Sequence, residues 1–202
     1  MPVLGLPLQR EKMAQNHLKL KTKHQKQLLQ IARESLAAYL AGQELPHYQI
    51  TDPELQQKRG VFVTLTKQGQ LRGCMGIFSP QTPLWQTVQN QVIIAATEDP
   101  RFPPVTQAEL DQLTIEISVL SPPRKINHWR QIKLGQEGVI IRRGPYSGTF
   151  LPQVAQETGW DLETFLSILC QQKAGLPANA YRDPATEIFV YTTEIFSENP
   201  TS

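Results

Sequence analysis

The chain has 202 residues, of which 40% are hydrophobic and 19% charged, with a formal net charge of +2. This composition supports one hydrophobic core, divided at most into two lobes, and excludes a wholly disordered protein. No apolar run approaches the ~18 residues of a membrane-spanning helix, and residues 1–30 lack the apolar segment of a secretory signal. The two cysteines, Cys74 and Cys170, form neither a disulfide framework nor a metal knuckle. We therefore expect a cytoplasmic protein with no membrane partner.

Residues 1–30 carry an excess of positive charge, with six lysines and arginines against Glu11 alone. A basic segment of this kind attracts phosphate-rich partners. It contains no aromatic residue for base stacking, however, so a solvated segment is the simpler interpretation and nucleic acid is not the favoured partner. We expect residues 1–21 to form a flexible basic leader and residues 22–202 to form the folded domain.

The first predicted elements are a helix and a hairpin. Apolar residues recur at helical spacing over 22–41, and Gly42 follows as a helix stop, which predicts a long amphipathic helix lying across a sheet. Strand patterns at 61–66 and 71–78 flank Gly69, which favours a tight turn between them. The apolar residues share one face in a register that pairs Val61 with Ile77, Val63 with Met75, and Leu65 with Gly73.

The middle of the chain predicts a helix, a capped turn and a strand. Pro83 opens a helical pattern over 83–97, with Thr82 as the candidate cap. Thr106 and Glu109 have the spacing of a capping box for a short helix. Apolar and polar residues then alternate over 115–119, as in a half-buried strand.

The last third of the chain predicts short strands at 138–143 and 148–151, a helix over 152–158, and a second helix capped by Asp161. Residues 187–196 are rich in β-branched and aromatic side chains, which predicts one final strand. Helices and strands are interspersed, but the best strand pair is an antiparallel hairpin. The expected fold class is therefore α+β, with a mostly antiparallel sheet flanked by helices.

The segment Leu71–Gly76 is the most informative for chemistry. Alternate side chains of a strand share a face, so Arg72 and Cys74 point the same way, with Cα atoms roughly 6–7 Å apart. A guanidinium at that distance favours a thiolate, which makes the pair a candidate nucleophile or anion site. Gly73 and Gly76 leave room beside Cys74 for another backbone or a ligand. The alternative is a small apolar cysteine on a packed strand beside a surface arginine.

Several short blocks, in order along the chain, carry a family resemblance: Gly60–Leu65, Leu71–Gly76, Asp99–Pro104, Ile117–Ser121, Leu151–Ala155, Gly159–Asp161 and Ala174–Pro177. Over roughly 22–196 the sequence resembles the AMMECR family, called system protein A in prokaryotes. The resemblance implies two unequal α+β lobes, the larger holding both termini and the smaller inserted, with the Arg-Gly-Cys motif near an interlobe cleft. It implies a Memo-like and a radical-SAM protein as partners, and it brings no established activity.

Three further positions are candidate binding residues. Asp99 and Arg101 flank a proline and form either an anion-recognising corner or a loop salt bridge. Glu116 points outward from its strand, and we expect it to face Arg72 across the sheet as an ion pair. Gln153 lies at a predicted helix start, where free N–H groups attract anions, although capping is the simpler role. No histidine or cysteine set has metal-ligand spacing and no nucleotide-binding loop is present, so no metal or cofactor is predicted.

Two functions remain open from the sequence. The first is an enzyme, or a subunit of one, that uses a cleft thiolate on a small anionic substrate, such as the product of a radical-SAM partner. The second is a non-catalytic regulatory module that binds protein or RNA. We rank the enzyme first, because Gly-Cys-Met-Gly is an unusual choice for a docking surface. The candidate site consists of Cys74 as the catalytic residue and of Arg72, Gly73, Gly76, Arg101, Glu116 and Gln153 as binding residues.

Overall fold

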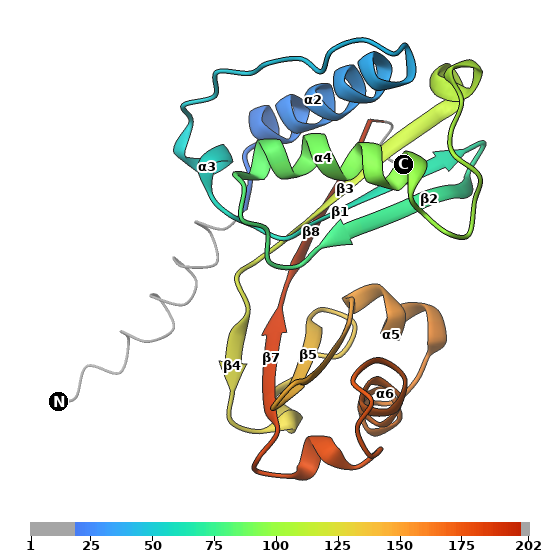
Figure 1. The fold of residues 1–202 in the computed structure, drawn as a ribbon. Helices are drawn as coiled ribbons and strands as arrows, with labels where there is room; N and C mark the ends of the chain where they lie inside the picture. The colour runs from blue at the N-terminus through green and yellow to red at the C-terminus, as the bar shows by residue number, and fades with distance from the viewer. Residues whose placement is uncertain (1–18, 199–202) are drawn as a thin grey trace, which may run out of the picture. The chain divides into compact units, whose positions relative to one another are not determined.

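The computed structural model describes residues 19–198, so most of the predicted basic leader lies outside the described residues. The chain divides into two compact units: the first runs to Val119 and resumes at Glu194, and the second spans Leu120–Thr193. Each unit has a four-stranded antiparallel sheet and its own buried core (Figure 1). The α+β prediction is confirmed, and the predicted interlobe cleft stays a prediction.

Within the described residues, the first unit has four helices and four strands. Its helices are α2 (Thr22–Leu40), α3 (Pro53–Gln56), α4 (Leu84–Thr97) and the 3₁₀ helix η1 (Gln107–Gln112). Its strands are β1 (Val61–Lys67), β2 (Gln70–Ile77), β3 (Leu113–Leu120) and β8 (Thr193–Ser197), in the spatial order β2-β1-β3-β8. Among the described helices, none is long and apolar enough to cross a membrane.

The β1–β2 hairpin forms in the predicted register. Gly69 takes a positive φ of 76° in the turn, a conformation that glycine adopts at no steric cost. Val61, Val63 and Leu65 of β1 are fully buried, whereas the residues between them are only half-buried. This alternation gives the sheet one face in the core and one face that carries the polar side chains.

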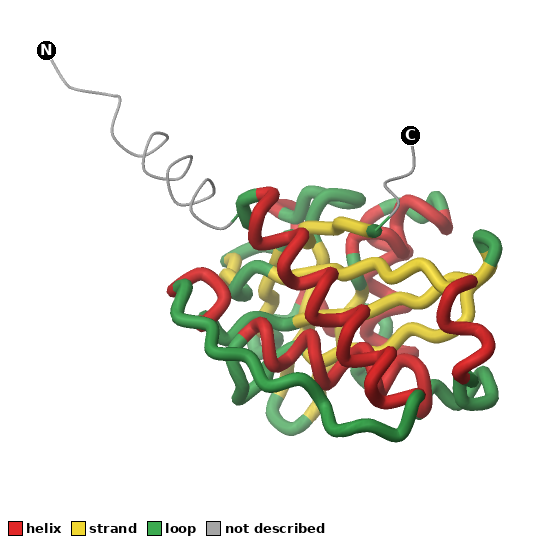
Figure 2. The backbone as a smooth tube through the Cα atoms, turned by 90° about the horizontal axis from the view of Figure 1, so that it is seen from above, coloured by secondary structure: helices red, strands yellow, loops and turns green. Residues whose placement is uncertain are grey.

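Helices α2 and α4 pack against the core face of this sheet (Figure 1). Seen from above, they lie across its strands (Figure 2). Gly73 allows the close approach of α4 to β2, because a Cβ at this position would overlap the carbonyl oxygen of Ala95. The predicted cap of α4 is wrong: Pro83 is the cap residue, and the Thr82 hydroxyl instead bonds with that of Thr87 at 2.9 Å.

The second unit has a sheet in the spatial order β4-β7-β5-β6. Its strands are β4 (Arg124–Ile126), β5 (Gly138–Arg143), β6 (Tyr146–Phe150) and β7 (Glu187–Tyr191). Its helices are α5 (Pro152–Thr158) and α6 (Leu162–Ile168), with the shorter helical turns η2 (Trp129–Gln131), η3 (Leu169–Lys173) and η4 (Ala180–Arg182). Two other predicted caps are present: Asp161 accepts the Thr164 N–H at 2.7 Å, and the Thr106–Glu109 capping box forms in the first unit.

The single strand predicted over 187–196 is wrong, because this segment forms β7 in one sheet and β8 in the other. The break falls at Thr192, whose carbonyl accepts the Ser121 N–H at 2.9 Å and whose N–H donates to the Ser121 hydroxyl at 2.9 Å. Hydrogen bonds to a neighbouring segment therefore interrupt a run that is continuous in composition.

Candidate functional site

Three polar side chains form a row across the first sheet, on the face opposite α2 and α4. Cys74 of β2 pairs with Thr64 of β1, and Thr64 pairs with Glu116 of β3. Directly paired residues of antiparallel strands point to the same face, so the three side chains share it. The Thr64 hydroxyl donates to Cys74 Sγ at 3.3 Å. At about 4.8 Å per strand spacing, the backbones of Cys74 and Glu116 lie about 10 Å apart.

A corner formed by Asp99 and Arg101 fixes the backbone of Cys74. The Asp99 carboxylate is buried and accepts the Cys74 N–H at 2.8 Å, and Arg101 Nη2 lies 3.5 Å from the Cys74 carbonyl oxygen. Strand β2 is at the edge of its sheet, so these contacts satisfy backbone groups that no further strand pairs. The corner holds the nucleophile candidate in a defined position.

Asp99 and Arg101 also bind each other, with nitrogen–oxygen distances of 2.9 and 2.7 Å. The hydrogen bonds from Arg101, and then that from the Cys74 N–H, hold the pKa of Asp99 well below its usual range. The same pairing raises the pKa of Arg101, with a smaller contribution from the Cys74 sulfur. The Arg101 side chain is 54% exposed, and its Nη1 has no hydrogen-bond partner among residues 19–198. A fixed cation with a free donor thus lies beside Cys74.

Arg72 has a different role from the predicted one. Its guanidinium binds both carboxylate oxygens of Glu109, at 3.0 and 3.1 Å, and donates to two carbonyl oxygens of the segment 103–104. The expected ion pair with Glu116 is therefore wrong. The Arg72 hydrogen bonds, followed by one from the Thr106 N–H, hold the pKa of Glu109 well below its usual range. Arg72 anchors a loop, and the cation next to the thiol is Arg101.

Glu116 is left without an ionic partner in the described part of the chain, and no hydrogen bond to its carboxylate is present there. Burial raises the pKa of this carboxyl group. A half-buried carboxyl with a raised pKa exchanges protons closer to neutral pH than an exposed one. It is thus suited to general acid–base chemistry.

Two other predicted binding residues, Gly76 and Gln153, are not part of the row formed by Cys74, Thr64 and Glu116. Gly76 leaves room for the Phe62 ring, which a Cβ would overlap, so its lack of a side chain serves packing. Gln153 lies on α5 in the second unit, where its Oε1 is buried with no hydrogen-bond partner among the described residues. Thr64 was not a predicted site residue, although the hairpin register already pairs it with Cys74.

A family model described as AMMECR1 matches residues 29–196. The chain belongs to the AMMECR1 family. A protein of Nanoarchaeum equitans is 46% identical over 182 residues, covering 85% of this chain and 99% of that protein. A Thermococcus gammatolerans protein is also 46% identical over 182 residues, covering 85% of this chain and 88% of its own length. A crystal structure of a Pyrococcus horikoshii protein described as uncharacterized has a TM-score of 0.78 and 42% identity, covering 89% of this chain and 94% of that one.

The family membership confirms the resemblance of the sequence and agrees with an activity that is not established for its members. Within residues 19–198, no group of three or more histidine, cysteine, aspartate or glutamate side chains could hold a metal ion. The site residues of this AMMECR1-family protein present a thiol, a hydroxyl, a carboxyl and a guanidinium. The Memo-like and radical-SAM partners stay predictions.

Proposed function

We propose that this protein is a thiol-dependent enzyme that acts on a small anionic molecule at the sheet face bearing Cys74. The observation that carries the proposal is the row of Cys74, Thr64 and Glu116, with Arg101 beside it. Each of these groups supplies one requirement of covalent catalysis: a nucleophile, a donor to its sulfur, a proton carrier and a cation. An inert packed cysteine needs none of them.

Acyl transfer is the reaction class that best uses these groups. The Cys74 thiolate forms a bond to the acyl carbon of a substrate lying over Thr64, and the bond from that carbon to the leaving group breaks. The leaving group keeps the electron pair and takes the proton of the Glu116 carboxyl. Water then attacks the thioester, returns a proton to Glu116, and releases the carboxylic acid and the thiolate.

Arg101 supports the anionic character of the substrate. Its side chain is half-exposed, and its Nη1 has no hydrogen-bond partner among the described residues, so an N–H donor is left for a ligand. A guanidinium with a free N–H donor binds carboxylate or phosphate oxygens. The substrate would therefore carry its negative charge on the Arg101 side of the thiol.

The test compares two alkylating reagents on the full chain. Iodoacetate is negatively charged and iodoacetamide is neutral, so the ratio of their rates at Cys74 reports the local potential. We expect this ratio to exceed that of a cysteine in an unstructured peptide. Arg101→Gln should lower it about fivefold, the factor for a charge interaction of about 1 kcal/mol near the surface. Cys170 should stay unlabelled, because it is fully buried and burial raises its pKa.

Two control variants separate charge from loop structure. Arg101→Lys keeps the positive charge and should retain most of the ratio, whereas Lys58→Gln removes an exposed positive charge elsewhere in the first unit and should leave it unchanged. A Cys74 that neither reagent labels in the folded protein, or a ratio equal to that of the peptide and insensitive to Arg101→Gln, would remove the support for the enzyme. The non-catalytic module that binds protein or RNA would then be the better hypothesis.

A further inference from the structure

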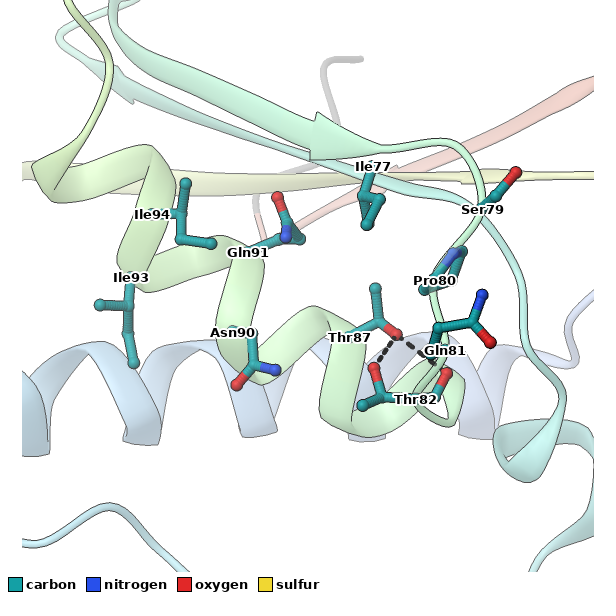
Figure 3. Close-up of a pocket in the computed structure, with 10 residues that line it drawn as sticks. All are labelled: Ile77, Ser79, Pro80, Gln81, Thr82, Thr87, Asn90, Gln91, Ile93 and Ile94. Carbon is teal, nitrogen blue, oxygen red and sulfur yellow. Dashed lines mark hydrogen bonds between the residues drawn. The ribbon is translucent and has the colours of Figure 1, made fainter.

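A pocket of about 490 Å³ opens between the end of β2 and one side of α4 (Figure 3). Its walls combine the isoleucines 77, 93 and 94 with amide and hydroxyl side chains, and no charged residue lines it. Ile77 lies on the core side of β2, whereas Cys74 points to the opposite face. The pocket is therefore a different place from the thiol row.

One buried polar side chain of this pocket lacks a partner among the described residues. Gln91 is only 7% exposed, yet its carboxamide has no hydrogen-bond partner in the part of the chain that the structure describes. In Figure 3 this carboxamide lies between Ile94 and Ile77, directed into the pocket. Its oxygen and nitrogen are not among the described side-chain atoms that are both closed off from solvent and unpaired, so the carboxamide is open to a hydrogen-bond partner that enters the pocket.

Two neighbouring buried polar side chains of α4 are paired within the protein, whereas the buried Trp85 Nε1 on the same helix has no partner among the described residues. Gln89 is 8% exposed and donates to the Ser35 hydroxyl at 3.2 Å and to the Pro46 carbonyl at 2.9 Å. The Thr87 hydroxyl, also in the pocket, bonds to Thr82. Gln91 is the exception among these three, and the pocket is the space from which a partner could reach it.

We propose that this pocket binds a neutral, planar heterocycle with a hydrogen-bond donor and an acceptor side by side, the class that includes nucleobases and nicotinamide. A carboxamide presents one acceptor and one donor group next to each other. These two groups can form a bidentate pair with the donor and acceptor on the edge of the heterocycle. The isoleucines offer apolar contact to the faces of a flat ring. A ligand charge would find no compensating residue, and the volume lies within the range of small-molecule sites.

The test follows the backbone amide signals of the ¹⁵N-labelled full chain while adenosine, uridine or nicotinamide is added to about 5 mM. We expect saturable shifts for at least one of these probes, confined to the segments 77–82 and 87–94. Gln91→Leu should weaken that binding at least tenfold. Gln86→Leu, the same substitution on the same helix outside the pocket, should leave the binding unchanged.

Two results would overturn the proposal. One is that none of the three probes shifts the pocket signals, or that the two leucine variants bind equally well. The other is a thermal midpoint of Gln91→Leu several degrees below that of Gln86→Leu, since this would mark Gln91 as a structural group. If Gln91 serves ligand binding and not stability, Gln91→Leu should be at least as stable as the parent chain.

Discussion

Two glutamates of the first unit show how the surroundings of a carboxyl group decide the free-energy cost of ionising it in the folded protein. Glu109 sits between Arg72, Lys67 and the Thr106 N–H, and these contacts lower its pKa. Glu116 lies on the next strand along the chain, without any such contact among the described residues, and burial raises its pKa. The ionised form is stabilised in the first case and penalised in the second. A group kept at such a cost is a candidate for function rather than for stability.

Replacing Glu116 by glutamine should therefore stabilise the protein near neutral pH. A folded pKa above the unfolded value means that the native state loses stability as the pH rises through the folded pKa. Removing the charge should restore up to about 1 kcal/mol at pH 7, a modest figure because the side chain is only half-buried. Urea unfolding at pH 7 and pH 4 measures this, and the gain should vanish at the lower pH.

Glu109→Gln is the matched control, and it should act in the opposite direction. It removes the ionic partner of Arg72 and should cost about 1–2 kcal/mol at pH 7. A Glu116→Gln variant that is destabilised like Glu109→Gln would mean that Glu116 has a stabilising partner, and its assignment as a proton carrier would lose its basis.

The sequence predicts that Cys74 and Glu116 point outward from their strands, because strand alternation is a local property. It does not predict which arginine lies beside the thiol. Arg72 is two residues from Cys74, but its long side chain turns to Glu109, whereas Arg101 reaches the cysteine from a loop that is distant in sequence. Such a choice depends on the path of the loop 99–109, which contains prolines and no periodic pattern.

At the scale of elements, α4 packs directly on β2 at Gly73. Gly73→Ala would place a methyl group on the Ala95 carbonyl, a backbone atom that no rotamer change can move. We expect a loss of about 3 kcal/mol in the free energy of unfolding, by overpacking a well-ordered contact. Denaturant unfolding measures the loss.

Gly144→Ala is the control for Gly73→Ala. Gly144 has a positive φ of 55° in the β5–β6 turn, with open space around it, so its substitution should cost only about 1 kcal/mol of backbone strain. Equal losses for the two alanine variants would show that α4 shifts easily on the sheet. The contact would then not be the constraint that fixes β2 and its cysteine.

The sequence also predicts elements better than it predicts their partners. The composition of residues 187–196 correctly predicts strand structure where β7 and β8 form. It cannot show that the chain passes from one sheet to the other at Thr192. That change depends on the hydrogen bonds of Thr192 with Ser121, about 70 positions away. The β1–β2 register, in contrast, is fixed by a short turn and by alternation within seventeen residues. The three predicted pairs form, although the register shift between Leu65 and Thr66 was not predicted.

At the scale of the whole molecule, each unit has its own core, and the two units differ in the surroundings of the carboxyl groups whose pKa is lowered. Asp99 and Glu109, whose partners are arginines, both lie in the first unit. In the second unit two carboxyl groups have a lowered pKa. Asp161 is exposed at a helix cap, and the partly exposed Glu187 forms a surface ion pair with Lys125. Exposed groups of this kind contribute little to stability.

Acid should therefore destabilise the first unit before the second. A carboxyl with a lowered folded pKa contributes stability that is complete above its unfolded pKa, about 4, and that is lost as the pH falls through the folded value. Between pH 7 and pH 3 we expect the thermal midpoint of the first unit to fall about 5 °C further than that of the second.

Trp85 reports on the first unit and Trp129 and Trp160 on the second, so tryptophan-to-phenylalanine variants separate the two signals. The pair Asp99→Asn and Glu109→Gln should remove most of this difference in the fall, since of the described carboxyl groups with a lowered pKa only Asp52 then remains in the first unit. Signals that fall together in the parent chain would instead show that the two units unfold as one.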